Sequence, residues 1–379
     1  MDSPSPSRIA FTGLAALAVA MGIGRFAFTP VLPMMQGEGL LTLAQGGWLA
    51  SANYVGYLAG ALLAMFVRVE PSRAIRVALV VIAATTFAMG FQEHMPGWLA
   101  NRFIAGVASA CVLVFAAAWA MEQLAALSRP ALGGVVFAGV GAGIAIAGLA
   151  CLVVMQQASG SVAAWITLGT LAVALTALAW RPLSSPGFAA PAPAEPFRFG
   201  GKGFLRLVLC YGAFGLGYIV PATFLPAMAR DAIPDPTVFG WTWPIFGAAA
   251  ALSTLAAAAV ARKIGHRTLW IVAALVMAVG VALPIFDTGV VALLVSALFV
   301  GGTFMVISMA GLQEARRVAG AHSREVIAAM TCAFALGQIV GPLAVSLLAQ
   351  GGFGYSAALA AATAVLILSA LFLLPRRKP

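Results

Sequence analysis

Charge is scarce in this chain of 379 residues: 8% of the residues are Asp, Glu, Lys or Arg, and 62% are hydrophobic. Soluble globular domains carry about 25% charged residues, because charges keep their surfaces wet. A chain of this length with so little charge cannot cover a water-facing surface. The composition therefore indicates an integral membrane protein, and it excludes a soluble enzyme, a nucleic-acid-binding protein and a secreted disulfide scaffold.

Metal-binding and catalytic patterns are also missing. The four cysteines lie inside apolar runs, and the sequence has no CxxC pair and no cluster of Cys and His. We therefore expect neither a disulfide nor a metal site. No HExxH motif or P-loop occurs, and no paired carboxylates or Ser/His/Asp set lies at membrane depth, so we expect no enzyme activity and no cofactor. Without a P-loop, any transport is secondary or passive.

Long apolar runs are abundant instead. A helix needs about 20 apolar residues to cross a bilayer, whereas the strands of a barrel would be short and alternating. This window predicts an all-α protein with twelve transmembrane helices. The predicted spans are 9–34, 43–67, 73–92, 96–121, 130–156, 160–180, 204–229, 237–261, 267–286, 289–312, 323–350 and 354–374.

The basic residues predict the orientation of these spans. If the amino terminus is cytoplasmic and the spans alternate, 18 of the 21 Lys and Arg residues fall in cytoplasmic segments and only Arg230 falls in an external loop. Cytoplasmic loops are enriched in Lys and Arg, so this distribution predicts that both termini are cytoplasmic. The net charge of +10 then reflects topology rather than affinity for nucleic acid.

The chain also shows an internal repeat. The segment 22–35 (GIGRFAFTPVLPMM) matches 215–228 (GLGYIVPATFLPAM) at an offset of 193 residues, and Trp48 meets Trp241 at the same offset. A Pro-rich segment with basic ends separates six spans from six. We predict two parallel six-helix repeats, residues 1–181 and 204–379, joined by a cytoplasmic linker over 182–203.

These features resemble the major facilitator superfamily. Asn101-Arg102-Phe103-Ile104-Ala105-Gly106 is similar to the RxxxG pattern of its fourth helix, and 262–267 (RKIGHR) is similar to its second basic loop motif. The segment 22–35 resembles the bacterial YbfB/YjiJ-type subgroup. The resemblance implies a major facilitator fold in the bacterial inner membrane. It further implies alternating access, and a substrate held near the midplane between helices 1, 4, 7 and 10.

Two arginines remain inside the predicted membrane. Arg25 lies 16 residues beyond Ile9, about 24 Å along a helix, and Arg102 lies at a similar depth on the fourth span. All eleven acids fall in or near the membrane surfaces. An arginine at depth costs at least about 2.5–3.5 kcal/mol, so it normally faces a cavity or a partner. Either the two guanidinium groups bind an anionic substrate, or they cap helix carbonyls and brace helices 1 and 4.

Other polar residues at depth are further candidates for substrate binding. Asn53 and Tyr57 share one face of helix 2, Tyr211 and Tyr218 share one face of helix 7, and Gln338 lies on helix 11. Hydroxyl and amide groups of this kind either bind an anion or join helices to one another. The superfamily motifs add a set of candidate gating residues. They are Gly106, Arg262, Lys263, Gly265, Arg267, Gly341 and Pro342.

The sequence therefore favours a secondary active or facilitated transporter of a small organic anion. We expect it to act as a monomer in the lipid bilayer, with protons as one possible coupling ion. The alternative is a proton-linked efflux pump for drugs and other amphiphiles, which would bind them in an apolar cavity rich in Met and Phe. A transporter-like receptor is a third hypothesis.

Overall fold

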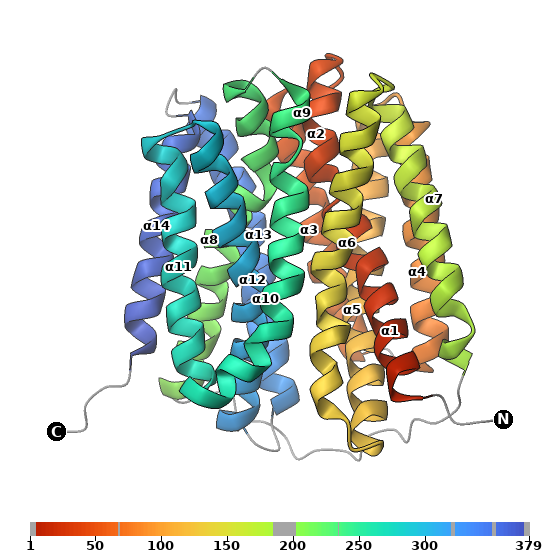
Figure 1. Ribbon diagram of the computed structural model, residues 1–379, viewed down its shortest axis with the longest axis vertical. Coiled ribbons are helices and arrows are strands. Elements are labelled where there is room, and N and C mark those ends of the chain that lie inside the picture. Colours follow the sequence, from red (N-terminus) through yellow and green to blue (C-terminus); the bar gives the residue numbers. More distant parts are fainter. Residues whose placement is uncertain are drawn as a thin grey trace.

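The computed structural model describes residues 5–66, 69–184, 202–233, 235–319, 323–350 and 354–374, and the regular structure in these segments is helical throughout. Most of the predicted linker, residues 185–201, lies outside the described residues. The helices stand side by side in a bundle, and α1 begins at the same end at which α14 stops (Figure 1). Which side of a membrane this end faces stays a prediction.

The first half of the chain contains seven α-helices and three short helical turns. They are α1 (Pro6–Leu17), η1 (Ala18–Ile23), α2 (Phe28–Gly37), α3 (Leu43–Phe66), α4 (Pro71–Gly90), α5 (Met95–Ala126), η2 (Pro130–Leu132), α6 (Gly133–Gln156), α7 (Gly160–Trp180) and η3 (Pro182–Ser184). The second half contains another seven. They are α8 (Lys202–Ala232), α9 (Pro236–Phe239), α10 (Thr242–Ile264), α11 (His266–Phe286), α12 (Val290–Ala319), α13 (Ser323–Gln350) and α14 (Gly354–Leu373).

The helix boundaries follow the predicted spans within a few residues, except at α12. Helix α12 continues to Ala319 rather than ending near residue 312, because a charged extension follows its apolar part. There Arg317 Nε and Nη2 donate to Glu314 at 2.8 and 2.7 Å, which favours one more helical turn. Nine helices of the described residues are long and apolar enough to span a membrane, and α10 and α13 contain shorter apolar helices. The count of twelve spans stays a prediction.

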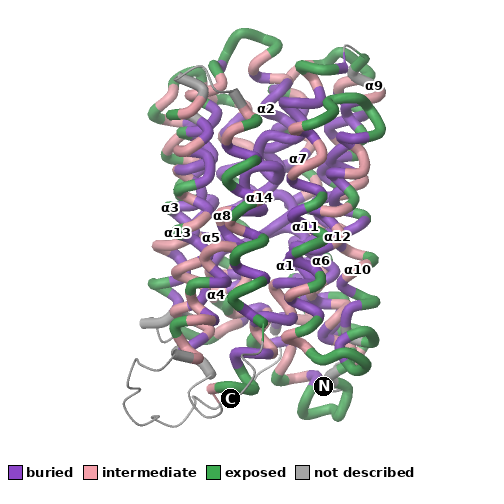
Figure 2. Tube along the Cα trace, turned by 90° about the vertical axis from the view of Figure 1, so that its left-hand side faces the viewer, coloured by how far each residue is buried: buried purple, intermediate pink, exposed green. Residues whose placement is uncertain are grey.

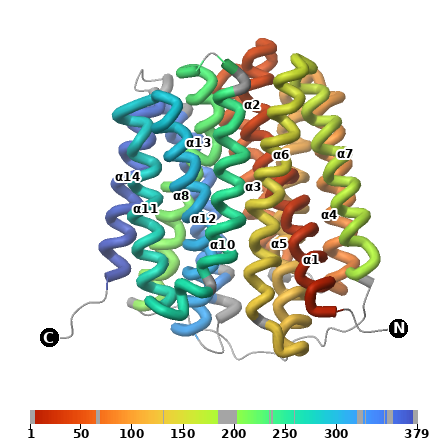
Figure 3. Tube along the Cα trace, viewed as in Figure 1, coloured from red at the N-terminus to blue at the C-terminus, as the bar shows by residue number. Residues whose placement is uncertain are grey.

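The packing of the helices is the same in both halves. In the first half α3 packs on α5, α4 on α7 and η1 on α6, and in the second half α10 packs on α12, α11 on α14 and α8 on α13. Figure 3 shows the two groups next to each other, α1–α7 in red to yellow and α8–α14 in green to blue. The predicted repeat thus has a counterpart in three dimensions.

Glycines permit the closest of these contacts. A Cβ placed on Gly106 would lie 2.1 Å from the carbonyl oxygen of Asn53, and one placed on Gly301 would lie 2.3 Å from that of Phe246. Asn53 and Phe246 are separated by the repeat offset of 193 and are therefore equivalent positions. In each half, a glycine on the fourth transmembrane helix packs against this position on the second transmembrane helix. Small residues of this kind let helix backbones touch in a membrane, where the hydrophobic effect does not press helices together.

The two halves meet mainly along α6 with α10 and α3 with α13, and α2 also packs on α8. Gly141 of α6 lies so close to α10 that a Cβ on it would be 2.3 Å from the backbone nitrogen of Ala251. The inner faces of the helices are buried and the outward faces carry the exposed residues (Figure 2). Closely packed helices therefore form the interface between the halves.

Replacement of Gly106 by Ala should destabilise the protein. The added Cβ forces α3 and α5 apart and costs about 1–3 kcal/mol of overpacking, more than the gain in helix propensity of about 1 kcal/mol. Thermal unfolding of the purified protein in detergent measures the effect. The matched control is Gly302→Ala on α12, where the nearest atom is 3.8 Å from the new Cβ. Equal melting temperatures for the two variants would contradict the close contact.

Candidate functional site

The first transmembrane helix is interrupted near its middle. Helix α1 continues through η1, residues 24–27 form a turn, and α2 begins at Phe28. Pro30 and Pro33 have no N–H to donate, and the hydrogen bond from Thr29 N to Phe26 O, at 3.1 Å, closes a tighter turn at the break. The interruption leaves backbone carbonyls at Gly24 and Arg25 available to partners outside the helix.

Arg102 and Asn53 bind these carbonyls. Arg102 Nη1 donates to Gly24 O at 3.2 Å and its Nη2 donates to Arg25 O at 3.0 Å. Asn53 Nδ2 donates to Gly24 O at 3.3 Å and to Arg102 O at 2.9 Å. The side chain of Arg102 is only 3% exposed. This fork of two N–H groups is the carbonyl-capping arrangement, and it ties helices α3 and α5 to the broken helix.

Arg25 points across to the second half of the chain. Its Nη2 donates to Gln338 Oε1 on α13, and Gln338 Nε2 donates to the hydroxyl of Tyr218 on α8. The guanidinium carbon lies 4.0 Å from the ring centroid of Tyr57 and 5.3 Å from that of Tyr54. Arg25 is 1% exposed, and its Nε and Nη1 have no hydrogen-bond partner among the described residues. Arg25 thus has N–H donors without a hydrogen-bond partner among the described residues, in a buried and largely apolar environment.

Aromatic rings surround this group. The ring of Tyr218 is parallel to those of Phe304 and Phe334, with centroids 5.6 and 5.5 Å away. Phe26, next to Arg25, contacts Trp243 and Phe304 edge to face. Tyr211 extends this cluster: the centroid of its ring lies 5.2 Å from that of Phe334 and 5.9 Å from that of Trp270. The candidate site therefore combines one cation with the faces and edges of many rings.

No carboxylate of the described residues pairs with Arg25 or Arg102. The two ion pairs in this part of the chain are Arg230–Asp231 at 2.9 Å and Arg317–Glu314 at 2.7 Å, and both lie at ends of helices. The charge of Arg25 is met by a neutral amide and by ring faces.

Contacts between the halves close one side of the site. Thr29 Oγ1 donates to Ala222 O at 3.2 Å, and the hydroxyls of Tyr54 and Thr223 are 3.0 Å apart. Thr29 and Ala222 are equivalent positions at the repeat offset of 193. A residue contacts its own equivalent only beside the axis that relates two repeats, so this contact lies on the axis between the halves. Arg230 Nη1 adds a bond to Pro33 O at 2.9 Å.

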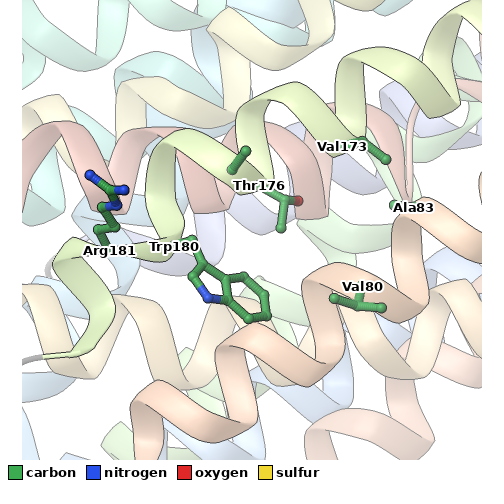
Figure 4. A pocket seen from close by; sticks show the side chains of 7 residues that line it. Val80, Ala83, Val173, Thr176, Trp180 and Arg181 are labelled. Carbon is green, nitrogen blue, oxygen red and sulfur yellow. The ribbon is translucent and has the colours of Figure 1, made fainter.

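Two surface pockets of the described structure lie away from Arg25. One is lined by Pro33, Glu38, Met155 and Phe239, among others, and the second lies between α4 and α7 (Figure 4). Arg25, Gln338, Tyr218, Asn53 and Tyr57 are instead packed against their neighbours. The structure therefore holds the candidate site in a closed conformation.

The chain matches one family model over most of its length. The model described as "Uncharacterised MFS-type transporter YbfB" covers residues 17–374. The chain belongs to this family. It is therefore a transporter of the major facilitator superfamily, as its sequence motifs predict. No curated protein sequence matches it.

Solved structures share the fold of this transporter. One is the nucleoside transporter NupG, with a TM-score of 0.70, 13% identity, and coverage of 96% of this chain and 98% of the other. Another is a D-xylose-proton symporter, with a TM-score of 0.75, 14% identity and 96% coverage of both chains. At this identity the likeness shows the fold alone.

The candidate gating residues of the transporter lie at helix ends and helix contacts. Arg267 Nε and Nη2 donate to the carbonyls of Leu373 and Leu374 at 2.6 and 3.3 Å, which ties α11 to the end of α14. Gly265, with φ of 81°, forms the turn from α10 to α11, and Arg262 and Lys263 are exposed beside it. Gly341 and Pro342 lie within α13, where Gly341 packs against Ile219 of α8.

Several residues of this site were not among those predicted from the sequence. Thr29, Tyr54 and Thr223 were not candidates for closing it, and Phe304, Phe334 and Trp243 were not candidates for lining it. The repeat offset contains part of this information, because it makes Thr29 and Ala222 equivalent. The aromatic lining has no such signal, since phenylalanines are spread over all parts of the chain.

Arg102→Gln should destabilise the transporter more than Arg25→Gln does. Loss of the fork leaves Arg25 O without its donor in a buried place, which costs about 1–3 kcal/mol. Arg25→Gln keeps an amide donor near Gln338 and removes a buried cation that has no carboxylate partner. Midpoints of thermal unfolding in one detergent give the comparison. A larger loss for Arg25→Gln would contradict the assignment of Arg102 to the helix break.

Proposed function

We propose that this transporter is a secondary carrier of a small organic anion, active or facilitated, that works by alternating access. The substrate binds near the midplane between the two halves, beside Arg25. The supporting observation is the buried guanidinium of Arg25, which has two unbonded nitrogens and a neutral amide as its hydrogen-bond partner. A carboxylate forms charge-assisted bonds with such a group and is a stronger acceptor than an amide oxygen.

In this proposal the side-chain amide of Gln338 occupies the position that the carboxylate of the substrate takes. Its Oε1 accepts from Arg25, and its Nε2 donates to Tyr218. A substrate carboxylate displaces this oxygen from Arg25, and the freed Gln338 and Tyr218 then provide hydrogen-bond donors from the second half. Substrate binding therefore exchanges a bond between the halves for bonds to the substrate. Asn53 and Tyr57 position Arg25, one by holding the helix break and the other through its ring.

The substrate proposed here carries a single negative charge. Arg102 already donates through Nη1 and Nη2 to Gly24 O and Arg25 O, so the guanidinium of Arg25 has more donor atoms left for an anion than that of Arg102. A second carboxylate would lie among Tyr218, Phe304 and Phe334, where an unpaired charge is costly. The rings favour a flat apolar body, so an aromatic monocarboxylate fits the site best.

The proposal also covers the orientation of the protein in the membrane and the ion that is coupled to transport. Both termini are cytoplasmic, twelve helices cross the bacterial inner membrane, and the carrier acts as a monomer. Residues 1–181 and 204–379 are the two moving bodies. A proton, if one is coupled, travels on the substrate, because the sequence has no acid at membrane depth. In the second form of this proposal, the carrier exchanges one anion for another.

Transport by purified protein in liposomes tests the proposal. A panel of aromatic and aliphatic monocarboxylates, dicarboxylates, sulfonates and cationic dyes is assayed with and without a pH gradient. Monocarboxylate uptake should fall at least about tenfold in Arg25→Gln, because a hydrogen bond to a charged group contributes about 1.5–3 kcal/mol. Arg25→Lys should retain part of the uptake, since a point charge replaces the planar fork.

The control for this assay is Arg129→Gln, an equal loss of charge at an exposed loop far along the chain from Arg25. Its uptake should equal that of the wild type. Unchanged anion uptake in folded Arg25→Gln protein would refute the proposal. Flux confined to cationic dyes would favour the efflux of amphiphiles, with the aromatic cluster as the binding surface.

Ligand-induced stabilisation offers a check that needs no transport. A ligand that binds only the folded state raises its stability by about 2.7 kcal/mol at 100 times its Kd. An accepted monocarboxylate should therefore raise the melting temperature of the wild type and leave that of Arg25→Gln unchanged. Equal shifts in both proteins would place the anion elsewhere on the molecule.

A further inference from the structure

An apolar groove lies on the outer face of the bundle, between α4 and α7. This groove has a volume of about 370 Å³ and is lined by Val80, Ala83, Val173, Thr176, Ala177, Trp180 and Arg181. Its volume is within the range of about 300–1,000 Å³ that small-molecule sites occupy. Figure 4 shows the indole of Trp180 extending from α7 towards Val80 of α4, with Arg181 at the end of the groove.

The helix register explains why the groove is apolar along its length and basic at one end. Positions 76, 80 and 83 share one face of α4, and positions 173, 177 and 180 share one face of α7. The basic residues stand at the beginning of α4 and just after the end of α7. Because the two helices run in opposite directions, these ends coincide.

The groove opens outward rather than towards the centre of the protein. Val80 and Val173 are 49% and 50% exposed. In a membrane transporter this surface is covered by the bilayer. A membrane component can therefore enter the groove from the side, whereas a soluble molecule would first have to cross the headgroup region.

The polar end of the groove is suited to an anion. Arg76 Nη2 donates to Trp180 O at 2.9 Å, and its guanidinium carbon lies 5.1 Å from the Trp180 ring centroid. These contacts fix Arg76 and Trp180 beside Arg181. The adjacent acid, Glu70, caps α4 by accepting from the N–H groups of Ser72 and Arg73 at 3.1 and 2.9 Å. Hydrogen bonds from the Ser72 side chain and from these backbone groups, together with the charge of Arg76, hold the pKa of Glu70 below its usual value.

We propose that this groove binds one anionic phospholipid. An acyl chain lies along Val80, Ala83, Val173 and Ala177, the lipid phosphate contacts Arg181 and Arg76, and Trp180 marks the headgroup level. Tryptophan is enriched at this level of membrane proteins, and a basic residue there attracts anionic lipids. With the predicted orientation, the lipid belongs to the cytoplasmic leaflet. The proposal concerns lipid binding alone and stands independently of the transported substrate.

Native mass spectrometry of the full transporter, released from nanodiscs, tests the proposal. The nanodiscs contain equal amounts of phosphatidylglycerol and phosphatidylcholine with identical acyl chains. Wild-type protein should retain one phosphatidylglycerol in preference to phosphatidylcholine. Arg181→Gln should reduce this preference about fivefold, as expected when one basic residue near the membrane surface is lost. Arg129→Gln removes the same charge from another loop and should keep the wild-type preference.

A second variant tests the apolar part of the groove without altering any charge. Ala177→Leu fills the groove and should reduce the retention of both lipids, whereas Ala174→Leu, on an exposed position outside the lining, should not. The proposal is overturned if wild-type protein shows no lipid preference, or if Arg129→Gln lowers the preference as much as Arg181→Gln. It also fails if Ala177→Leu retains as much lipid as Ala174→Leu.

Discussion

The structure depends on how the broken first helix is stabilised. An interruption in the membrane exposes carbonyl groups that water cannot reach, and each unsatisfied group is costly there. The fork of Arg102 and the amide of Asn53 bind the carbonyls of Gly24 and Arg25. With that break held in place, the side chain of Arg25 extends across the interface to Gln338. One arginine thus stabilises the backbone that presents the other.

Close contacts between helices keep this arrangement compact. Gly106 lies against the backbone of Asn53, the same residue that binds the helix break, so the packing of α3 on α5 also sets the position of the capping amide. The equivalent contact of Gly301 with Phe246 positions a ring rather than an amide. The two halves therefore share a backbone plan but differ in their side chains. The two arginines and Asn53 come from the first half, and Gln338 and most of the aromatic rings come from the second.

Much of the fold could be predicted from the sequence, because apolar length and loop charge are local properties. The helices match the predicted spans closely, and the offset of 193 predicts equivalent packing in both halves. The charged end of α12 was missed, since a hydropathy window does not detect a helix held by an ion pair. In the site, the burial of Arg25 and Arg102 inside the helix bundle could be predicted, because both lie in long apolar runs. Their different partners could not, because the bond from Arg25 to Gln338 joins residues far apart in the sequence, and sequence alone left carbonyl capping by Arg102 as one of two alternatives.

The buried charge of Arg25 has a consequence for ion leakage. At the point where the halves meet, the contacts of its guanidinium among the described residues are to a neutral amide and to ring faces. A proton or sodium ion that enters the pathway meets this positive charge in a medium of low dielectric, and a fixed arginine of this kind excludes cations from other membrane pores. If the halves move about Arg25 as proposed, this fixed charge keeps cations out of the pathway while the conformation changes.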